Sequence, residues 1–234
     1  MRAQFGYRTP DDWYEAYLLE CVSSDTSWLD VGCGRFLFPS NGRTALLLAS
    51  RCKLLVGLDP GNNIDDNPYV HERVKAQIED YRDSRRFDLI TLRMVAEHIT
   101  EPENTLNALA RLAKPGGRVV IYTVSKWSPA SLAAAATPMA IHHAAKRFLW
   151  KTETRDTFPT AYRMNTRGAL HTLFARAGFA EQSFEYIDDC RSLQRWRAGA
   201  LMELSAWRLL RAIGLPYPER CILASYVRNG SGAS

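Results

Sequence analysis

The stretch Trp28-Leu29-Asp30-Val31-Gly32-Cys33-Gly34 decides the fold of this chain. An apolar run, expected to be a strand over Ser27–Val31, meets an acidic residue and enters a glycine loop. Glycine has no Cβ, so a loop built on Gly32 and Gly34 can adopt conformations closed to other residues and can approach a ligand closely. A helix over Gly42–Arg51 is expected to follow this loop.

A second apolar run, residues 53–59, ends in another acid, Asp59, followed by Pro60. An acid at the tip of the second strand of a strand–loop–helix–strand unit can accept hydrogen bonds from both hydroxyls of a ribose. The alternative is that Asp59 is an ordinary turn or capping residue before Pro60. Taken together, the unit predicts an adenosine-containing ligand.

Strands and helices alternate along most of the chain, which predicts an α/β fold: a Rossmann-like, doubly wound, mostly parallel sheet with helices on both faces. Further strands are expected at 73–77, 87–92, 118–124, 184–187 and 221–227, and further helices at Pro10–Cys21, 101–113, 166–177 and 192–213. Ligands bind such sheets beyond the carboxyl ends of the strands. The residues expected to share that edge are Asp30, Gly32, Asp59, Asp80, Arg93 and His98.

The alternation of strands and helices breaks after Ser125, where an alanine-rich, aromatic segment follows. We expect a single domain over residues 1–234, with this segment forming a helical lid inserted at about residues 126–165. The alternative is an interfacial segment that touches lipid or a lipid-linked substrate. His142 and His143 are adjacent, so they do not form the i, i+4 pair of a metal site, and no metal is expected.

Composition narrows the class of protein further. The net charge is +5, but 25 acidic residues are mixed among 30 basic ones, so no phosphate-binding stripe and no nucleic-acid partner are expected. The five cysteines are scattered without a C-x-x-C pair, which favours a reducing compartment. With no signal-peptide pattern and no apolar run long enough to insert stably into a bilayer, a cytoplasmic location is expected.

Six segments, in the same order and at similar spacing, resemble the class I S-adenosylmethionine-dependent methyltransferases. They are 29–34 (LDVGCG), 56–60 (VGLDP), 78–80 (IED), 87–90 (FDLI), 95–99 (VAEHI) and 112–117 (LAKPGG). The Glu97-His98 pair is most similar to the branch that includes ubiquinone-pathway O-methyltransferases and many natural-product enzymes. The resemblance implies a seven-stranded sheet whose last strand is antiparallel.

The resemblance also implies roles for individual residues in holding S-adenosylmethionine and its product S-adenosylhomocysteine. Asp30 is expected to orient the loop and the ammonium end of the cofactor. The loop residues Gly32, Cys33 and Gly34 are expected to pass beneath its methionine and ribose. Asp59 and Pro60 are expected at the ribose, Glu79 and Asp80 beside the adenine, and Leu92 and Arg93 to offer backbone carbonyls to the amino group.

The glycine loop departs from the family pattern at one point. The family's loop is usually G-x-G-x-G, and Phe36 occupies its third glycine position here. A dinucleotide site is the nearest alternative, but that fingerprint requires a glycine at the position of Leu37. The local path of the loop is therefore open at this stage, whereas the first two glycines are in place.

His98 is the candidate catalytic residue, because a histidine that is neutral near physiological pH can take a proton from a hydroxyl or amine. The alternative is a structural histidine that caps the next helix or contacts the cofactor. We expect methyl transfer to an oxygen, nitrogen or carbon atom of a small or medium-sized organic acceptor. The alternatives are a nucleic-acid or protein methyltransferase and a non-catalytic S-adenosylmethionine-binding protein. The acceptor and the oligomeric state are left open.

Overall fold

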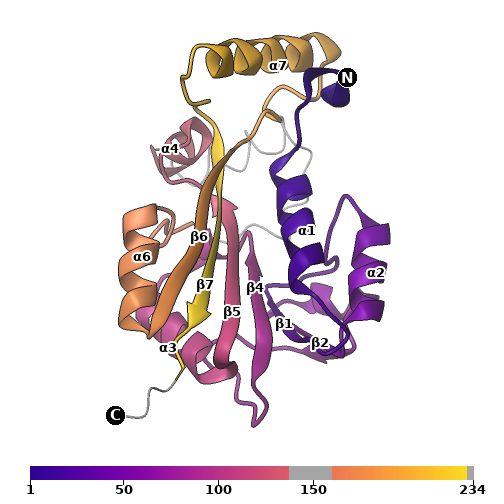
Figure 1. Cartoon of the computed structure of the whole chain (residues 1–234), viewed down its shortest axis with the longest axis vertical. Coiled ribbons are helices and arrows are strands. Elements are labelled where there is room, and N and C mark those ends of the chain that lie inside the picture. The colour runs from indigo at the N-terminus through magenta and orange to yellow at the C-terminus, as the bar shows by residue number, and fades with distance from the viewer. Residues whose placement is uncertain (137–159, 231–234) are drawn as a thin grey trace.

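The computed structural model describes residues 1–136 and 160–230, arranged around one seven-stranded sheet (Figure 1). Its strands are β1 (Ser27–Val31), β2 (Leu54–Leu58), β3 (Glu72–Val74), β4 (Phe87–Arg93), β5 (Ala113–Val124), β6 (Phe179–Asp188) and β7 (Arg220–Arg228). The described helices are α1 (Pro10–Cys21), α2 (Gly42–Arg51), α3 (Pro102–Leu112), α4 (Pro129–Ala136), α6 (Arg167–Arg176) and α7 (Arg197–Ala212). Three short 3₁₀ turns accompany them: η1 (Arg2–Phe5), η2 (Asn62–Asp66) and η3 (Ala96–His98).

The strand order is β3-β2-β1-β4-β5-β7-β6, and β7 runs antiparallel to both of its neighbours. The other neighbouring pairs are parallel, which confirms the predicted doubly wound sheet and its antiparallel last strand. From β1 the chain builds outward to β3 and then crosses back to place β4 on the other side of β1. This reversal between β1 and β4 is the point at which such sheets bind ligands.

Helices cover both faces of the sheet, because alternate strand residues point to opposite sides. Leu29 of β1 packs into the core beneath α3 and α6, where Leu109 and Phe174 are fully buried. Trp28, the preceding residue, packs into the opposite core with Leu18 of α1 and residues of α2. Figure 1 shows α1 and α2 beside the β1–β2 end of the sheet and α6 beside β6.

The two N-terminal helices have the predicted bounds, and both expose large apolar side chains. Thr9 caps α1 with a capping box to Asp12, which is why the helix begins at Pro10. The side chain of α1 that packs most deeply beside Leu18 is Tyr14, whereas Trp13 is 40% exposed. On α2 the side chain of Leu46 is 63% exposed.

Several element boundaries differ from the sequence prediction. β6 begins at Phe179, directly after Gly178 (φ +81°), because its first half, Ala180 to Ser183, pairs with β7 although it lacks an apolar run. α7 begins at Arg197 rather than at 192, since the buried carboxylate of Glu203 accepts the backbone N–H groups of Ser192 and Leu193 outside the helix. The third strand is confined to Glu72–Val74.

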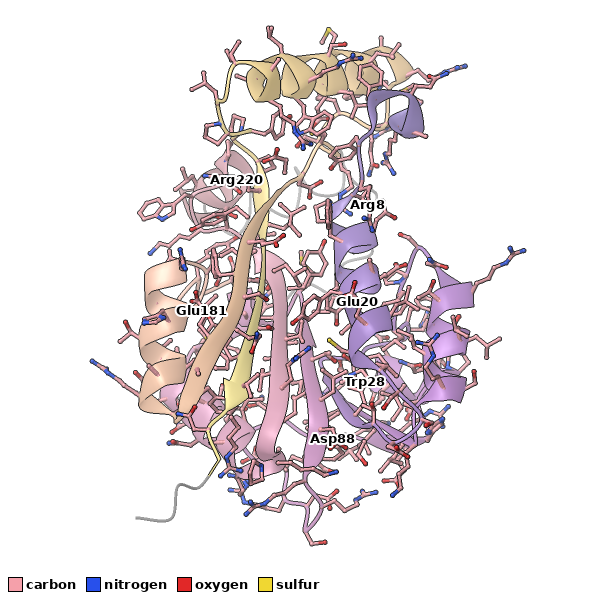
Figure 2. All side chains as sticks on the ribbon, viewed as in Figure 1. Arg8, Glu20, Trp28, Asp88, Glu181 and Arg220 are labelled. Carbon is pink, nitrogen blue, oxygen red and sulfur yellow. The ribbon has the colours of Figure 1, made fainter. Side chains whose placement is uncertain are left out.

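The segment 114–117, between the helix predicted at 101–113 and the strand predicted at 118–124, lies in the first part of β5. Gly116 has φ +76°, and a Cβ on Gly117 would lie 2.8 Å from the carbonyl oxygen of Lys114. Lys114 Nζ contacts both carboxylate oxygens of Asp88 at 2.8 Å. Asp88 lies at the opposite end of the sheet from Arg220 (Figure 2), so this cluster shapes the edge away from the predicted ligand site.

A buried hydrogen-bond chain connects β1 to β4. Trp28 Nε1 donates to Thr91 Oγ1 at 2.7 Å, and Thr91 Oγ1 donates to Asp30 Oδ1 at 2.6 Å. Because all three side chains are buried, the chain satisfies polar atoms that would otherwise destabilise the core. Burial raises the pKa of Asp30 to about 7, against the lowering effects of the Thr91 hydrogen bond and the charge of Arg93.

The raised pKa of Asp30 predicts a pH dependence of stability. The folded protein holds this proton up to a pH of about 7, whereas an unfolded aspartate releases it near pH ~4. Between these values the folded state binds more protons, so rising pH lowers the free energy of unfolding, by at most about 1.4 kcal/mol per pH unit. Asp30→Asn keeps an acceptor for Thr91 and removes this titration.

We therefore expect Asp30→Asn to gain stability relative to the wild type as the pH rises. Urea unfolding of both proteins, without ligand, at about pH 5 and about pH 8 measures the difference. A difference in unfolding free energy that is equal at the two pH values would contradict the assignment.

Candidate active site at the carboxyl ends of the strands

A cavity of about 630 Å³ opens at the carboxyl ends of β1, β2 and β4, at the point where the strand order reverses. It brings together six predicted site residues, which are Gly32, Asp59, Pro60, Glu79, Asp80 and His98. Its remaining lining residues are Val31, Leu58, Ala76, Gln77, Ile78, Met94, Val95, Ile99, Thr100, Glu101 and Asn104. The edge of the sheet at which the site was predicted thus contains a cavity lined by both apolar and acidic residues.

The glycine loop leaves β1 through a left-handed turn at Gly32 (φ +69°). Gly32 N–H donates to the carbonyl oxygen of Leu58 at 2.7 Å, which ties the end of β1 to the end of β2. A Cβ on Gly32 would lie 2.3 Å from Cγ2 of Val95. Glycine is therefore required here both by the positive φ and by the close packing of Val95.

The carboxylate of Asp59 connects the two loops that border the cavity. Its Oδ2 accepts the backbone N–H of Gly34 at 3.0 Å, and its Oδ1 accepts the N–H of Gly61 at 2.7 Å. Asp59 is half-buried and lines the cavity. Since each carboxylate oxygen can accept two hydrogen bonds, one acceptor position per oxygen is left for a ligand.

Two further predicted acids border the cavity at its outer end. Glu79 is half-buried, and its Oε1 accepts a hydrogen bond from the Thr105 hydroxyl, whereas Asp80 is exposed. The preceding residue, Ile78, is buried and contributes an apolar wall beside them. An apolar wall next to carboxylate acceptors fits a flat heterocycle that carries an amino group.

Five predicted residues do not line the cavity. They are Asp30, Cys33, Gly34, Leu92 and Arg93. Asp30 and Leu92 are buried in the core, and the Cys33 thiol lies beneath the loop, where a Cβ on Gly57 would come within 2.8 Å of it. Burial raises the pKa of the Cys33 thiol above its ordinary range. The Arg93 side chain turns away toward Asp11, with 3.7 Å between the charged groups.

Met94 and Val95 were missed by the sequence prediction and line the cavity just beyond Arg93. Met94 has φ +54°, a left-handed conformation that is uncommon for a residue with a side chain. Its N–H donates to the carbonyl oxygen of Tyr122 at 2.7 Å, which extends the β4–β5 pairing by one residue. No periodicity in the sequence marks such a turn, because it results from pairing with a distant strand.

His98 is half-buried in η3, directly after β4, and lines the cavity. Its backbone N–H donates to the carbonyl oxygen of Val95 at 2.9 Å. The preceding residue, Glu97, points into the protein, where its Oε2 accepts a hydrogen bond from the Thr123 hydroxyl at 2.6 Å. Glu97 therefore anchors the turn to β5, which places His98 at the edge of the cavity.

The segment predicted as a lid leaves and rejoins the fold at one place. Lys126 N–H donates to the carbonyl oxygen of Asn165 at 2.9 Å, so the two ends of the insertion meet. The returning chain is fixed beside His98, because the N–H groups of Ala161 and Tyr162 both donate to the carbonyl oxygen of Glu97. Residues 137–159, including His142 and His143, lie outside the described residues.

A second polar cluster lies near the ends of β4, β5 and β6. Asp11 of α1 contacts both Arg93 and Arg191, and Arg191 also binds Asp189 at 2.6 Å. Arg191 Nη2 lies 3.4 Å from the hydroxyl of Tyr122. Arg191 is therefore held in ion pairs after the end of β6.

Two other features of the described residues complete the description of the site. A smaller hollow of about 360 Å³ lies between the N-terminal segment, β6 and α7 and contains none of the predicted site residues. Among the residues that the structure describes, no group of three or more His, Cys, Asp or Glu side chains is arranged to hold a metal ion. Likewise, none of the described helices is both long and apolar enough to cross a bilayer.

Comparisons with known proteins agree with this geometry. The family model described as a methyltransferase domain matches residues 3–183. A ubiquinone biosynthesis O-methyltransferase from Coxiella burnetii is 29% identical over 107 residues, which cover 42% of this chain and 43% of that protein. The chain thus spans less than half the length of this curated relative.

Solved structures share the fold at low sequence identity. The N-methyltransferase NodS from Bradyrhizobium japonicum WM9 superposes with a TM-score of 0.54 at 15% identity, covering 94% of this chain and 97% of that one. The geranyl diphosphate C-methyltransferase from Streptomyces coelicolor A3(2) gives a TM-score of 0.58 at 13% identity, covering 92% and 78%.

The family model covers more than half of the chain, and the sheet has the seven strands and the antiparallel last strand that the resemblance implies. This protein therefore belongs to the methyltransferase-domain family and has the fold of the class I S-adenosylmethionine-dependent methyltransferases.

Proposed function

We propose that this protein transfers a methyl group from S-adenosylmethionine to a small or medium-sized organic acceptor. The observation that carries the proposal is the Asp59 carboxylate, held between the two loops of the cavity by Gly34 and Gly61. Such a carboxylate presents paired acceptors to two neighbouring hydroxyls, as a ribose requires.

The cavity fits S-adenosylmethionine in size and in chemistry. Its volume of about 630 Å³ lies within the range of roughly 300–1,000 Å³ that small-molecule sites occupy. Asp59 supports binding at the ribose, and the outer wall of Ile78, Glu79 and Asp80 supports binding at the adenine. The methionine end would then extend over Gly32 toward Val95 and His98.

The predicted contacts of Leu92 and Arg93 with the amino group require only their backbone carbonyls at the end of β4. Asp30 supports the site without touching the cofactor. Its carboxyl group is buried and bonded to Thr91, and this bond holds β1 against β4 directly beneath the loop. Cys33 and Gly34 also act by supporting the loop: the Cys33 side chain is buried, and the Gly34 N–H donates to Asp59. Asn67 Nδ2 donates to the carbonyl oxygen of Gly34 at 3.0 Å, which holds the loop from below.

S-adenosylmethionine supplies an electrophilic methyl group on a positively charged sulfur; the acceptor atom bonds to this carbon as the carbon–sulfur bond breaks. The residues of this chain mainly have to hold the acceptor atom about 3 Å from the methyl carbon and in line with the sulfur. His98 stands at the cavity edge, where it can take the proton that a hydroxyl or amine acceptor loses.

The insertion at 126–165 would act as a lid over the acceptor. Two observations support this role: its two ends meet through Lys126 and Asn165, and the returning residues Ala161 and Tyr162 are bonded to Glu97 beside His98. A cover at this place excludes water from the reacting atoms and contributes contacts that select the acceptor.

A reducing, cytoplasmic location is proposed from the five cysteines, all of which have free thiols.

Substitution of Asp59 tests the cofactor assignment. We expect Asp59→Ala to weaken binding of S-adenosylhomocysteine by about 1–3 kcal/mol, because two charge-assisted hydrogen bonds to the ribose are lost. Titration calorimetry with S-adenosylhomocysteine measures the change. The control is Asp66→Ala, an exposed acid of the neighbouring η2 turn that pairs with Arg35 and lies outside the cavity.

Unchanged affinity in a folded Asp59→Ala protein would show that the ribose lies elsewhere. Failure of the wild type to bind S-adenosylhomocysteine at millimolar concentration would contradict the proposed function itself. Thermal unfolding of each variant without ligand separates these outcomes from loss of the fold.

His98 is tested by the kinetics of methyl transfer. With radiolabelled S-adenosylmethionine and a panel of phenols, catechols, amines and carboxylic acids, we expect acceptor-dependent formation of S-adenosylhomocysteine. On the acceptor so found, His98→Gln should lower kcat by about 10²–10⁴-fold. Affinity for S-adenosylhomocysteine should change less than twofold. An unchanged kcat would assign His98 a structural role.

A further inference from the structure

The connection between β6 and β7 is far longer than the fold requires. These strands are antiparallel neighbours, which a turn of a few residues can join. Here β6 ends at Asp188 and β7 begins at Arg220, and the connection contains the 16-residue helix α7. α7 is therefore not needed to connect the two strands.

The inward side of α7 packs against the rest of the chain. Leu204 and Trp207 are buried against Tyr7 and Cys190. The only acid of the helix, Glu203, is 5% exposed and accepts hydrogen bonds from Ser192, Leu193 and the Tyr217 hydroxyl. The single negative charge of α7 is thus removed from its surface.

The outward side of α7 carries no charge. Residues spaced three and four apart share a face of a helix, and the line opposite the buried side consists of Ala198, Met202, Ser205, Leu209 and Ala212. All five are exposed, with Met202 at 65% and Leu209 at 64%. Beside this line, Leu201 and Ile213 are exposed as well.

The exposed charges of α7 are all positive. Arg197, Arg208 and Arg211 are exposed. At 100° per residue Arg197 and Arg208 fall on one flank of the helix, between the outward line and the buried side, whereas Arg211 lies over the ring of the buried Trp207. α7 is therefore a helix of about 24 Å with an apolar outward face and a basic flank.

Exposed apolar side chains are concentrated in this part of the molecule. Of the fifteen large apolar residues that are exposed among the described ones, seven lie between 193 and 215: Leu193, Trp196, Leu201, Met202, Leu209, Ile213 and Leu215. Figure 1 shows α7 across one extremity of the molecule, beyond the end of the sheet. In Figure 2 its side chains project outward from that extremity, so a flat surface can reach them.

We propose that α7 docks this protein on the surface of a bilayer that contains anionic lipids. The outward face would enter the interface between headgroups and acyl chains, and the arginine flank would contact the lipid phosphates. Charge complementarity favours this occupant over a second copy of the chain. A second copy would present the same three arginines and no exposed acid on α7. The proposal is independent of the methyltransferase reaction.

Vesicle flotation tests the docking surface with the whole 234-residue chain. The wild type should float with vesicles of phosphatidylglycerol and phosphatidylcholine and at least tenfold less with phosphatidylcholine alone. Met202→Glu combined with Leu209→Glu should lower binding to the anionic vesicles at least tenfold, because two charges enter the apolar face. Arg197→Gln combined with Arg208→Gln should lower it several-fold and reduce its dependence on salt.

The matched control is Leu46→Glu combined with Leu47→Glu, two exposed leucines of α2, which should bind as the wild type does. Amide hydrogen exchange gives a second measure: vesicles should slow exchange over residues 197–212 in the wild type. Absence of flotation with both vesicle types, or equal loss in the α2 control, overturns the proposal. A concentration-dependent dimer that the α7 variants abolish, without vesicle binding, also overturns it and identifies a second copy as the occupant.

Discussion

The carboxylate of Asp59 is the constraint on which the site depends. One oxygen holds the loop that follows β1, through Gly34, and the other holds the loop that follows β2, through Gly61. These two loops border the cavity, so its shape follows from one charged group at the end of one strand. The left-handed turn at Gly32, bonded to Leu58, sets the direction in which the first loop leaves the sheet.

The cavity and the neighbouring polar cluster are built in different ways. The walls proposed to hold the nucleoside and methionine come from consecutive loops and from backbone groups, supported by the buried chain from Trp28 to Asp30. The polar cluster lies outside the cavity lining and draws on segments that are distant in the sequence: α1 contributes Asp11, and the loop after β6 contributes Arg191.

The same difference explains what the sequence could predict. The mostly parallel sheet, the glycine loop, Asp59 and the Glu97-His98 turn follow from short local patterns, and the structure confirms the fold that they imply. Met94, with its positive φ, and the ion pairs of Arg191 depend on distant strands, which one sequence does not reveal. The first half of β6 was missed because pairing with β7, rather than an apolar run, makes it a strand.

Two of the recognised segments serve the fold rather than the cavity. Asp88 and Lys114 form an ion pair at the amino-terminal end of β4, at the opposite edge of the sheet from the site. Gly117 is required there because a Cβ would meet the carbonyl oxygens of Lys114 and Phe87. The family motifs are therefore distributed over the whole sheet, and only those at the carboxyl ends of the strands line the proposed ligand site.

A crystal structure of the complex with S-adenosylhomocysteine tests the central claim most directly. The account predicts both ribose hydroxyls within hydrogen-bond distance of the Asp59 carboxylate, the adenine against Ile78, and the sulfur above Gly32 beside Val95. A ribose bound away from Asp59, or a ligand seated outside this cavity, would contradict it.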